Sequence, residues 1–105
     1  MSVESGPLMK PVIVCLCGST RFADKYTEVT RTLTLDGKIV LSVGVFTHTE
    51  TLPQDVKDML DNLHLRKIDL ADYVYIINVG GYVGESTRQE IEYALSNNKP
   101  VEYLI

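Results

Sequence analysis

Two patterns of hydrophobic positions alternate along the chain. The run at residues 11–17 is continuously apolar or β-branched, as in a strand buried on both faces of a parallel sheet, and further largely apolar runs predict strands at residues 38–43, 73–79 and 100–105. Between them apolar residues recur at intervals of three and four, which predicts helices over about 22–35, 51–71 and from 86 past 95. This alternation predicts parallel strands with right-handed crossovers, and therefore a three-layer α/β sandwich.

The length and charge limit the domain count and the partners. A chain of 105 residues has room for one domain, which we place at residues 11–105, after a flexible N-terminal leader at residues 1–10. The net charge of -4 argues against a nucleic-acid polymer as partner. Because no apolar run approaches the roughly 20 residues that span a bilayer, we expect no membrane insertion.

Cys15 and Cys17 are two residues apart in the first predicted strand, so their side chains point to the same face. They could share a metal ion, but His48 and His64 do not complete a zinc-binding sequence pattern with them. We therefore predict two buried core thiols and no metal site. Reduced, unpaired thiols are typical of a cytoplasmic protein.

Two helix starts have the spacing of a capping box, Thr51 with Gln54 and Ser86 with Gln89. The inward-facing residues expected along these helices are Val56, Met59, Leu60, Leu63 and Ile68 in the second, and Ile91, Ala94 and Leu95 in the third. His64 lies on the stripe of the second helix. A histidine there is more often a core residue than a catalyst.

The loops that follow parallel strands meet at one edge of the sheet, where open α/β proteins bind ligands. A Gly-Ser-Thr turn, a threonine-rich loop and a glycine-rich loop should converge at this edge. Their backbone amides and hydroxyls suit an anion and their aromatic rings suit a flat ligand, as in a nucleoside or nucleotide. The candidate substrate-binding residues are Gly18, Ser19, Thr20, Arg21, Phe22, Phe46, His48, Gly81, Tyr82, Gly84, Ser86 and Thr87.

Glu90 lies in the first turns of the third predicted helix, at the flank of its apolar stripe. A carboxylate at this edge can attack an anomeric carbon and form a covalent glycosyl ester. Retaining chemistry needs a second group about 5 Å away to carry a proton to the leaving base. The candidates are His64, Asp72 and His48. The alternative is that Glu90 is an ordinary helix-flank carboxylate facing solvent.

Two segments carry a resemblance to a known family. Residues 17–22 (CGSTRF) and 81–94 (GYVGESTRQEIEYA) resemble the nucleoside 2-deoxyribosyltransferase-like superfamily, which includes the 2'-deoxynucleoside 5'-monophosphate N-glycosidases. The resemblance covers essentially residues 9–105. It implies a flavodoxin- or Rossmann-like parallel sheet of four strands, no metal or organic cofactor, and a homodimer or larger homo-oligomer.

The resemblance also implies roles for individual residues. It places the nucleophile on Glu90, and contacts to sugar or phosphate on Gly18, Ser19, Arg21 and Ser86. Two positions depart from the family's pattern: Cys15 stands where relatives often have a tyrosine, and His64 where they have an aspartate.

The function expected from these observations is cleavage or transfer of the N-glycosidic bond of a nucleoside or nucleoside 5'-monophosphate. Two alternatives stay open. One is a non-catalytic nucleotide-binding module on the same fold, and the other is a structural or assembly domain.

Overall fold

The computed structural model describes residues 10–44 and 51–105. Strands and helices alternate along the chain in the predicted order: β1 (Ile13–Gly18), α1 (Ala23–Leu35), β2 (Ile39–Leu41), α2 (Gln54–Leu70), β3 (Tyr73–Ile77), α3 (Glu85–Ser96) and β4 (Val101–Tyr103). Short 3-10 turns, η2 (Thr20–Phe22) and η4 (Val79–Gly81), precede α1 and α3. Phe46, His48 and all of the predicted leader except Lys10 lie outside the described residues.

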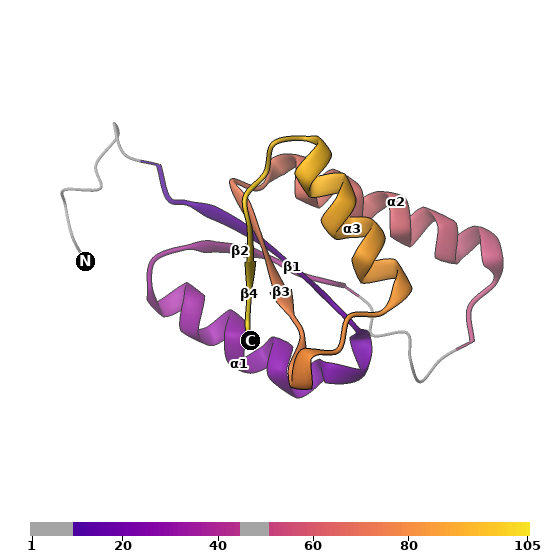
Figure 1. Ribbon diagram of the computed structural model, residues 1–105, viewed down its shortest axis with the longest axis horizontal. Helices are drawn as coiled ribbons and strands as arrows, with labels where there is room; N and C mark the ends of the chain where they lie inside the picture. Colours follow the sequence, from indigo (N-terminus) through magenta and orange to yellow (C-terminus); the bar gives the residue numbers. More distant parts are fainter. Residues whose placement is uncertain (1–9, 45–50) are drawn as a thin grey trace.

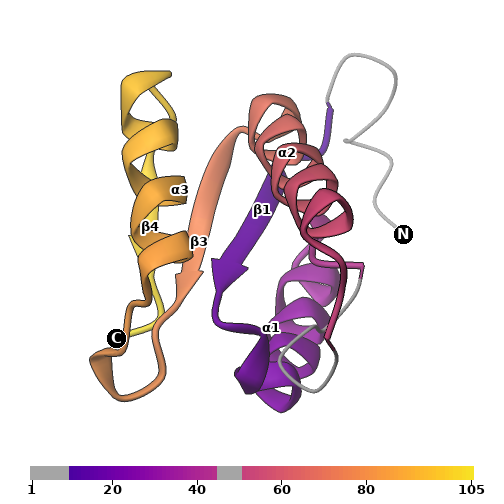
Figure 2. The same ribbon diagram turned by 90° about the vertical axis from the view of Figure 1, so that its right-hand side faces the viewer.

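The strands form one parallel sheet in the order β2-β1-β3-β4. Helix α1 covers one face, while α2 and α3 cover the other (Figures 1 and 2). The predicted three-layer α/β sandwich with a flavodoxin- or Rossmann-like sheet of four strands is therefore confirmed. The helices that follow β1 and β3 lie on opposite faces, so the boundary between these two strands is the topological switch point of the sheet.

Strand β1 is buried on both faces, which explains its continuous apolar sequence. Val14 and Leu16 pack toward α1, whereas Cys15 and Cys17 pack toward α2 and α3, and all four side chains are fully buried. The prediction that the two cysteines share one face of the sheet is confirmed. Because β1 is hydrogen-bonded to β2 on one side and β3 on the other, these two thiols are held on one of the two central strands of the sheet.

The predicted capping box at α2 is wrong. The helix begins at Gln54 with Pro53 at its N-cap, and no side chain caps it, so Thr51 lies outside the helix. Proline fixes φ near the helical value and pre-forms the start of the helix without a capping hydroxyl. The side-chain amide of Gln54 donates instead to Asp58 Oδ1 at 2.8 Å, one turn further on.

The predicted capping box at α3 is also wrong. The helix begins at Glu85, its N-cap is Gly84, and no side chain caps it. Ser86 therefore lies inside the first turn, where its hydroxyl cannot take the N-cap role. The amide of Gln89 donates to Glu85 Oε2 at 3.3 Å rather than reaching back to an N-cap amide.

Three residues assigned to the apolar stripes are exposed rather than buried: Met59 at 50%, Leu63 at 46% and Leu95 at 58%. Helix α2 has 17 residues and is therefore about 25 Å long, whereas β1 spans about 20 Å. The first half of α2 consequently extends past the sheet. The residues that α2 buries, His64 and Ile68, both lie in its second half. Among the helices of residues 10–44 and 51–105, none is long and apolar enough to cross a membrane.

Candidate active site at the carboxyl edge of the sheet

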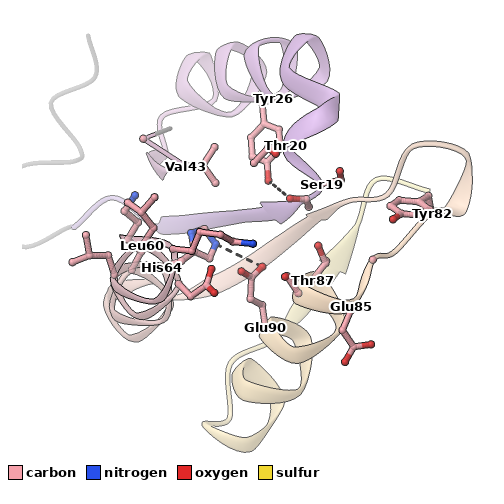
Figure 3. Close-up of a pocket in the computed structure, with 18 residues that line it drawn as sticks. Ser19, Thr20, Tyr26, Val43, Leu60, His64, Tyr82, Glu85, Thr87 and Glu90 are labelled. Atoms are coloured by element: carbon pink, nitrogen blue, oxygen red, sulfur yellow. Dashed lines mark hydrogen bonds and ion pairs between the residues drawn. The ribbon is translucent and has the colours of Figure 1, made fainter. Parts of the chain in front are cut away.

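A cavity of about 420 Å³ lies at the carboxyl edge of the sheet, where β1 and β3 end (Figure 3). Its volume falls within the range of roughly 300–1,000 Å³ that is usual for small-molecule sites. Its wall comes from the turn after β1, the residues after β2, the exposed side of α2, and the start of α3. The topological switch point of this fold is thus hollowed and lined with polar groups.

Most of the predicted site residues meet in this cavity. Those that line it are Gly18, Ser19, Thr20, His64, Tyr82, Gly84, Ser86, Thr87 and Glu90. Arg21, Phe22 and Gly81 do not line it, although they lie in the same two turns. Phe46 and His48 fall outside the described residues.

Arg21 and Phe22 instead pack against Tyr82, a residue that lines the cavity. The Arg21 guanidinium carbon is 4.7 Å from the centre of the Tyr82 ring, and its Nε donates to Ser19 Oγ at 3.1 Å. The Phe22 ring meets Tyr82 edge to face, with ring centres 6.1 Å apart. These contacts join the turn after β1 to the loop before α3, and they set where Tyr82 stands at the rim.

Gly18 is needed where β1 leaves the sheet. A Cβ on Gly18 would lie 2.7 Å from the backbone oxygen of Ile77 on the neighbouring strand. The Gly18 carbonyl also accepts a 2.8 Å hydrogen bond from the Tyr26 hydroxyl. The close approach of two backbones fixes the start of the turn that carries Ser19 and Thr20.

Gly18→Ala is expected to lower the free energy of unfolding by about 1–3 kcal/mol, because the added methyl group overpacks a backbone contact that cannot give way. Urea unfolding followed by circular dichroism measures the change. Gly44→Ala is the matched control, because Gly44 also lines the cavity while a Cβ there meets nothing within 4 Å. Equal stability of the two variants would contradict the close packing at Gly18.

Glu90 points into the cavity from α3 and faces His64 on α2 (Figure 3). The distance between Glu90 Oε1 and His64 Nε2 is 3.9 Å, and the side chains are 18% and 8% exposed. Burial raises the pKa of the Glu90 carboxyl, and the nearby imidazole partly offsets this. Burial also acts to lower the pKa of His64, but the hydrogen bond with Cys15 and the charge of Glu90 outweigh it, so the pKa is raised. The pair therefore combines a largely buried carboxyl group and a buried imidazole, and the pKa of each is above its ordinary value.

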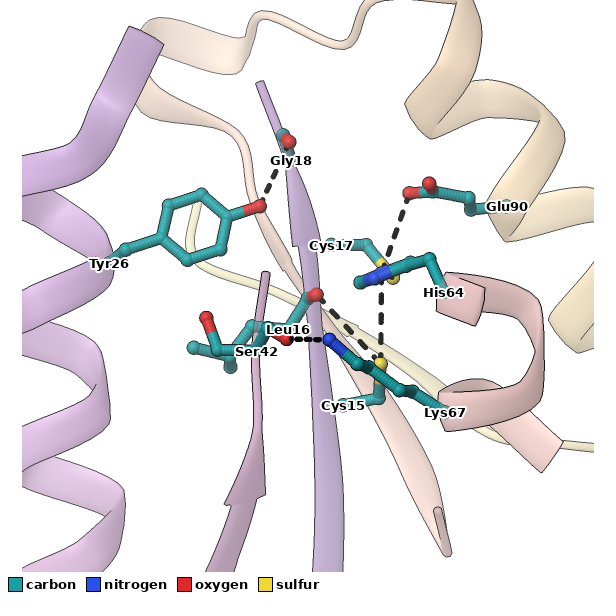
Figure 4. Close-up of polar contacts among 9 residues, drawn as sticks. All are labelled: Cys15, Leu16, Cys17, Gly18, Tyr26, Ser42, His64, Lys67 and Glu90. Carbon is teal, nitrogen blue, oxygen red and sulfur yellow. Dashed lines mark hydrogen bonds and ion pairs between the residues drawn. The ribbon is translucent and has the colours of Figure 1, made fainter. Parts of the chain in front are cut away.

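The two cysteines lie directly beneath this pair (Figure 4). His64 Nε2 is 3.4 Å from Cys17 Sγ and 3.7 Å from Cys15 Sγ. The hydrogen bond from Cys17 lowers the pKa of Cys15 to about 6, whereas the same bond and burial raise that of Cys17. Both thiols are free and buried, as predicted. Their closeness to His64 has no signal in the sequence, because the contact joins residues that lie 47 and 49 positions apart.

Asp72, one of the predicted catalytic candidates, does not lie near the cavity. Asp72 Oδ2 accepts a 2.8 Å hydrogen bond from the amide of Ile13, the first residue of β1. This places the carboxylate at the amino edge of the sheet, a strand length away from the cavity. Its role is to satisfy a strand-end amide, so we exclude it from the site.

Apart from His64, sequence reasoning missed the residues of α2, and those directly after β2, that form one side of the cavity. Lys57, Asp61, His64 and Lys67 recur at intervals of three and four, a spacing that could have identified them as one helix face. Lys67 Nζ donates to the Ser42 carbonyl at 2.6 Å, just beyond β2. The other lining residues without a prior assignment to the site are Tyr26, Val43, Gly44, Leu60, Leu63 and Glu85.

No protein-family model matches this chain, and no curated protein sequence matches it either. The functional assignment below is therefore built on the cavity, the residues that line it and the resemblance of two sequence segments.

Proposed function

We propose that the protein cleaves or transfers the N-glycosidic bond of a nucleoside or nucleoside 5'-monophosphate, with Glu90 as a covalent nucleophile. The observation that carries this proposal is the position of Glu90. Its largely buried carboxylate faces the same cavity as the Gly18–Thr20 turn and lies 3.9 Å from an imidazole nitrogen. A solvent-facing helix-flank carboxylate, the alternative left open by the sequence, would have neither feature.

The reaction proceeds in two displacements. Glu90 attacks the anomeric carbon, the bond between that carbon and the base nitrogen breaks, and its electron pair leaves with the base. His64 Nε2 donates the proton that neutralises the departing base. Water, or a second nucleobase in transfer, then attacks the glycosyl ester, His64 takes up the proton of the acceptor, and Glu90 is released.

The separation between Glu90 and His64 fits this sequence with one adjustment. Retaining glycosidases hold their two catalytic carboxyl groups about 5–5.5 Å apart, so that the scissile bond fits between them. The observed distance is 3.9 Å, so the two side chains separate by about 1–1.5 Å when the substrate enters. Until then the charge of the imidazolium partly offsets burial, which disfavours the ionised carboxylate that a nucleophile requires.

His64 also accounts for the two departures from the family's pattern. The tyrosine that helps to orient the nucleophile in relatives is replaced by Cys15, whose side chain is fully buried below the cavity. In this chain an imidazole from the position of the relatives' aspartate lies 3.9 Å from the Glu90 carboxylate. We assign to His64 both the orientation of Glu90 and the proton transfer.

The phosphate of a monophosphate substrate has a place at the start of α3. Gly84 caps this helix without a side-chain hydrogen bond, so the first-turn amides remain available to a ligand. Ser86 and Thr87 line the cavity in the same turn and add hydroxyl donors. The arrangement puts the anion at one end of the cavity and the anomeric carbon one helical turn away, near Glu90.

Ser86→Ala is expected to raise KM for nucleoside monophosphates about 10-fold or more and to leave that for nucleosides nearly unchanged. A hydrogen bond to a charged group is worth about 1.5–3 kcal/mol, and only the monophosphate makes it. Steady-state kinetics on both substrate classes measures the ratio. Ser96→Ala, at the exposed far end of α3, is the control. An equal change in KM for both substrate classes would show that Ser86 does not bind the phosphate.

The activity test is incubation of the protein with a panel of nucleosides and nucleoside 5'-monophosphates, with chelator present, scored for free base by chromatography. Release of base from at least one substrate is expected. Tight nucleotide binding in calorimetry without base release would assign the non-catalytic binding module instead. If the protein neither binds nucleotides nor releases base, a structural or assembly domain would be the remaining assignment.

We also propose that the protein works as a homodimer or larger homo-oligomer in the cytoplasm. Ile39 and Tyr103 on the edge strands β2 and β4 are 46% and 47% exposed. Exposed apolar side chains on open strand edges favour association.

A further inference from the structure

Three donor atoms from two elements converge below the cavity, and the Glu90 carboxylate from a third element lies beside them (Figure 4). Cys15 Sγ and Cys17 Sγ come from β1, His64 Nε2 from α2 and the Glu90 carboxylate from α3. The two sulfurs and the ring nitrogen all lie within 4.8 Å of one another. The His64 atom that faces both sulfurs is also the atom that faces Glu90.

Hydrogen bonding alone does not account for this convergence. One imidazole nitrogen carries either one proton or one lone pair, so it cannot make a full hydrogen bond with two sulfurs and a carboxylate at once. A metal ion at the centre can bond all of them. The cluster has the chemistry of a metal site rather than of a core packing contact.

The distances match a tetrahedral zinc site. Zn–S bonds of about 2.3 Å and Zn–N bonds of about 2.0–2.1 Å place sulfur and nitrogen about 3.5 Å apart. The observed values of 3.4 Å and 3.7 Å lie on either side of that separation. Glu90 Oε1 is 3.9 Å from the nitrogen but lies outside the group of atoms that are all within 4.8 Å of one another, so its side chain has to turn toward the sulfurs to become a fourth ligand.

We propose that Cys15, Cys17 and His64 bind one zinc ion, with Glu90 as the fourth ligand. Two thiolates with one imidazole form a borderline-soft set that suits zinc, whereas Mg²⁺ and Ca²⁺ prefer oxygen ligands. Both sulfurs are carried by β1, a central strand that is paired on both sides, so their spacing exists before the ion arrives. The ion enters through the cavity, because His64 and Glu90 line it while the cysteines lie fully buried below.

The bound ion switches the enzyme off. Zinc takes the His64 nitrogen and the Glu90 carboxylate, which are the proton carrier and the nucleophile of the proposed reaction. This consequence rests on the proposed function, whereas the metal site does not. The protein is therefore active when metal-free and inhibited by zinc, reversibly on chelation.

The site is tested by titrating the reduced, metal-free full chain with Co²⁺, a spectroscopic substitute for zinc. We expect one Co²⁺ per chain, thiolate-to-cobalt charge-transfer absorption, tetrahedral visible bands, and displacement by an equivalent of Zn²⁺. Mg²⁺ should give no response. Folded wild-type protein that shows no charge-transfer absorption would overturn the proposal.

Variants identify the ligands. Cys17→Ser and His64→Gln are each expected to weaken zinc binding by more than the roughly 100-fold that loss of an outer-shell partner can cost. Glu92→Gln, on the exposed side of α3, is the control and should bind as wild type does. Circular dichroism verifies folding, and if Cys17→Ser does not fold, His64→Gln decides. Unchanged affinity in folded His64→Gln overturns the ligand set.

The inhibition has its own readout. Base release measured in chelator should fall to background with one equivalent of Zn²⁺ and return on re-chelation. Full turnover by protein with zinc bound would overturn the inhibitory role. A cobalt spectrum without base release under any condition would leave the metal site standing and remove the proposed enzymatic function.

Discussion

Glu90→Gln is expected to lower the rate of base release by roughly 10⁴-fold or more, while nucleotide affinity stays within a small factor of wild type. Glutamine keeps the shape of the side chain in the cavity but cannot form the glycosyl ester. Because the loss falls on the chemical step, kcat and kcat/KM should decrease together. Chromatography of released base and calorimetry of nucleotide binding, both in chelator, measure the two quantities.

The neighbouring carboxylate provides the control. Glu92 lies two residues further along α3, on its exposed side, and Glu92→Gln should turn over like the wild type. The comparison separates loss of the nucleophile from loss of one negative charge on the helix. Undiminished base release by Glu90→Gln would remove this carboxylate from the mechanism.

His64→Gln is expected to lower kcat by about 10²–10⁴-fold and to abolish the alkaline limb of the pH profile. The wild-type profile should be bell-shaped. Activity rises as Glu90 ionises, at a pH above its ordinary pKa because burial disfavours the charged form, and falls as His64 loses its proton, also above its ordinary pKa. The midpoints of both limbs therefore lie at higher pH than the ordinary pKa values of a glutamate carboxyl and a histidine imidazole.

The groups that face the imidazole come from several elements: Cys15 and Cys17 on β1, Lys67 on α2, and Glu90 on α3. Initial rates in overlapping buffers, measured in chelator, give the profile. Asn62→Ala, at an exposed position on α2, serves as control and should keep both limbs. An alkaline limb that persists in His64→Gln would assign the proton transfer to another group.

Hydrophobic periodicity predicted the fold because burial on the two faces of a parallel sheet leaves a direct trace in the sequence. The fully apolar β1 followed that rule, whereas Met59, Leu63 and Leu95 on the helical stripes did not. The helix starts did not follow it either, since capping depends on one or two local conformations. Pro53 and Gly84 began their helices without a capping side chain, although both sequences offered one.

The site was only partly predictable for a similar reason. Turns that follow parallel strands must meet at one edge, which placed Gly18, Ser19 and Glu90 together. Which face of α2 meets that edge depends on how the helix crosses the sheet, and sequence spacing does not specify this. The contacts of His64 with the two cysteines, and the remoteness of Asp72, therefore emerged only in three dimensions.

The proposed zinc site and the proposed catalytic pair use the same two side chains, so the metal content of a sample sets its apparent activity. Protein purified without chelator should show base release that increases on addition of chelator. Free thiols are needed for both zinc binding and its reversal, which fits a reducing compartment.

In the proposed mechanism Glu90 forms a covalent glycosyl intermediate, and the configuration of the transfer product tests this step most directly. Turnover of a β-nucleoside or its monophosphate in the presence of methanol, in chelator, yields a methyl glycoside whose anomeric configuration is read by proton NMR. Two displacements at one carbon predict retention, hence the β product. The α product would show direct attack by the acceptor and would contradict a nucleophilic role for Glu90.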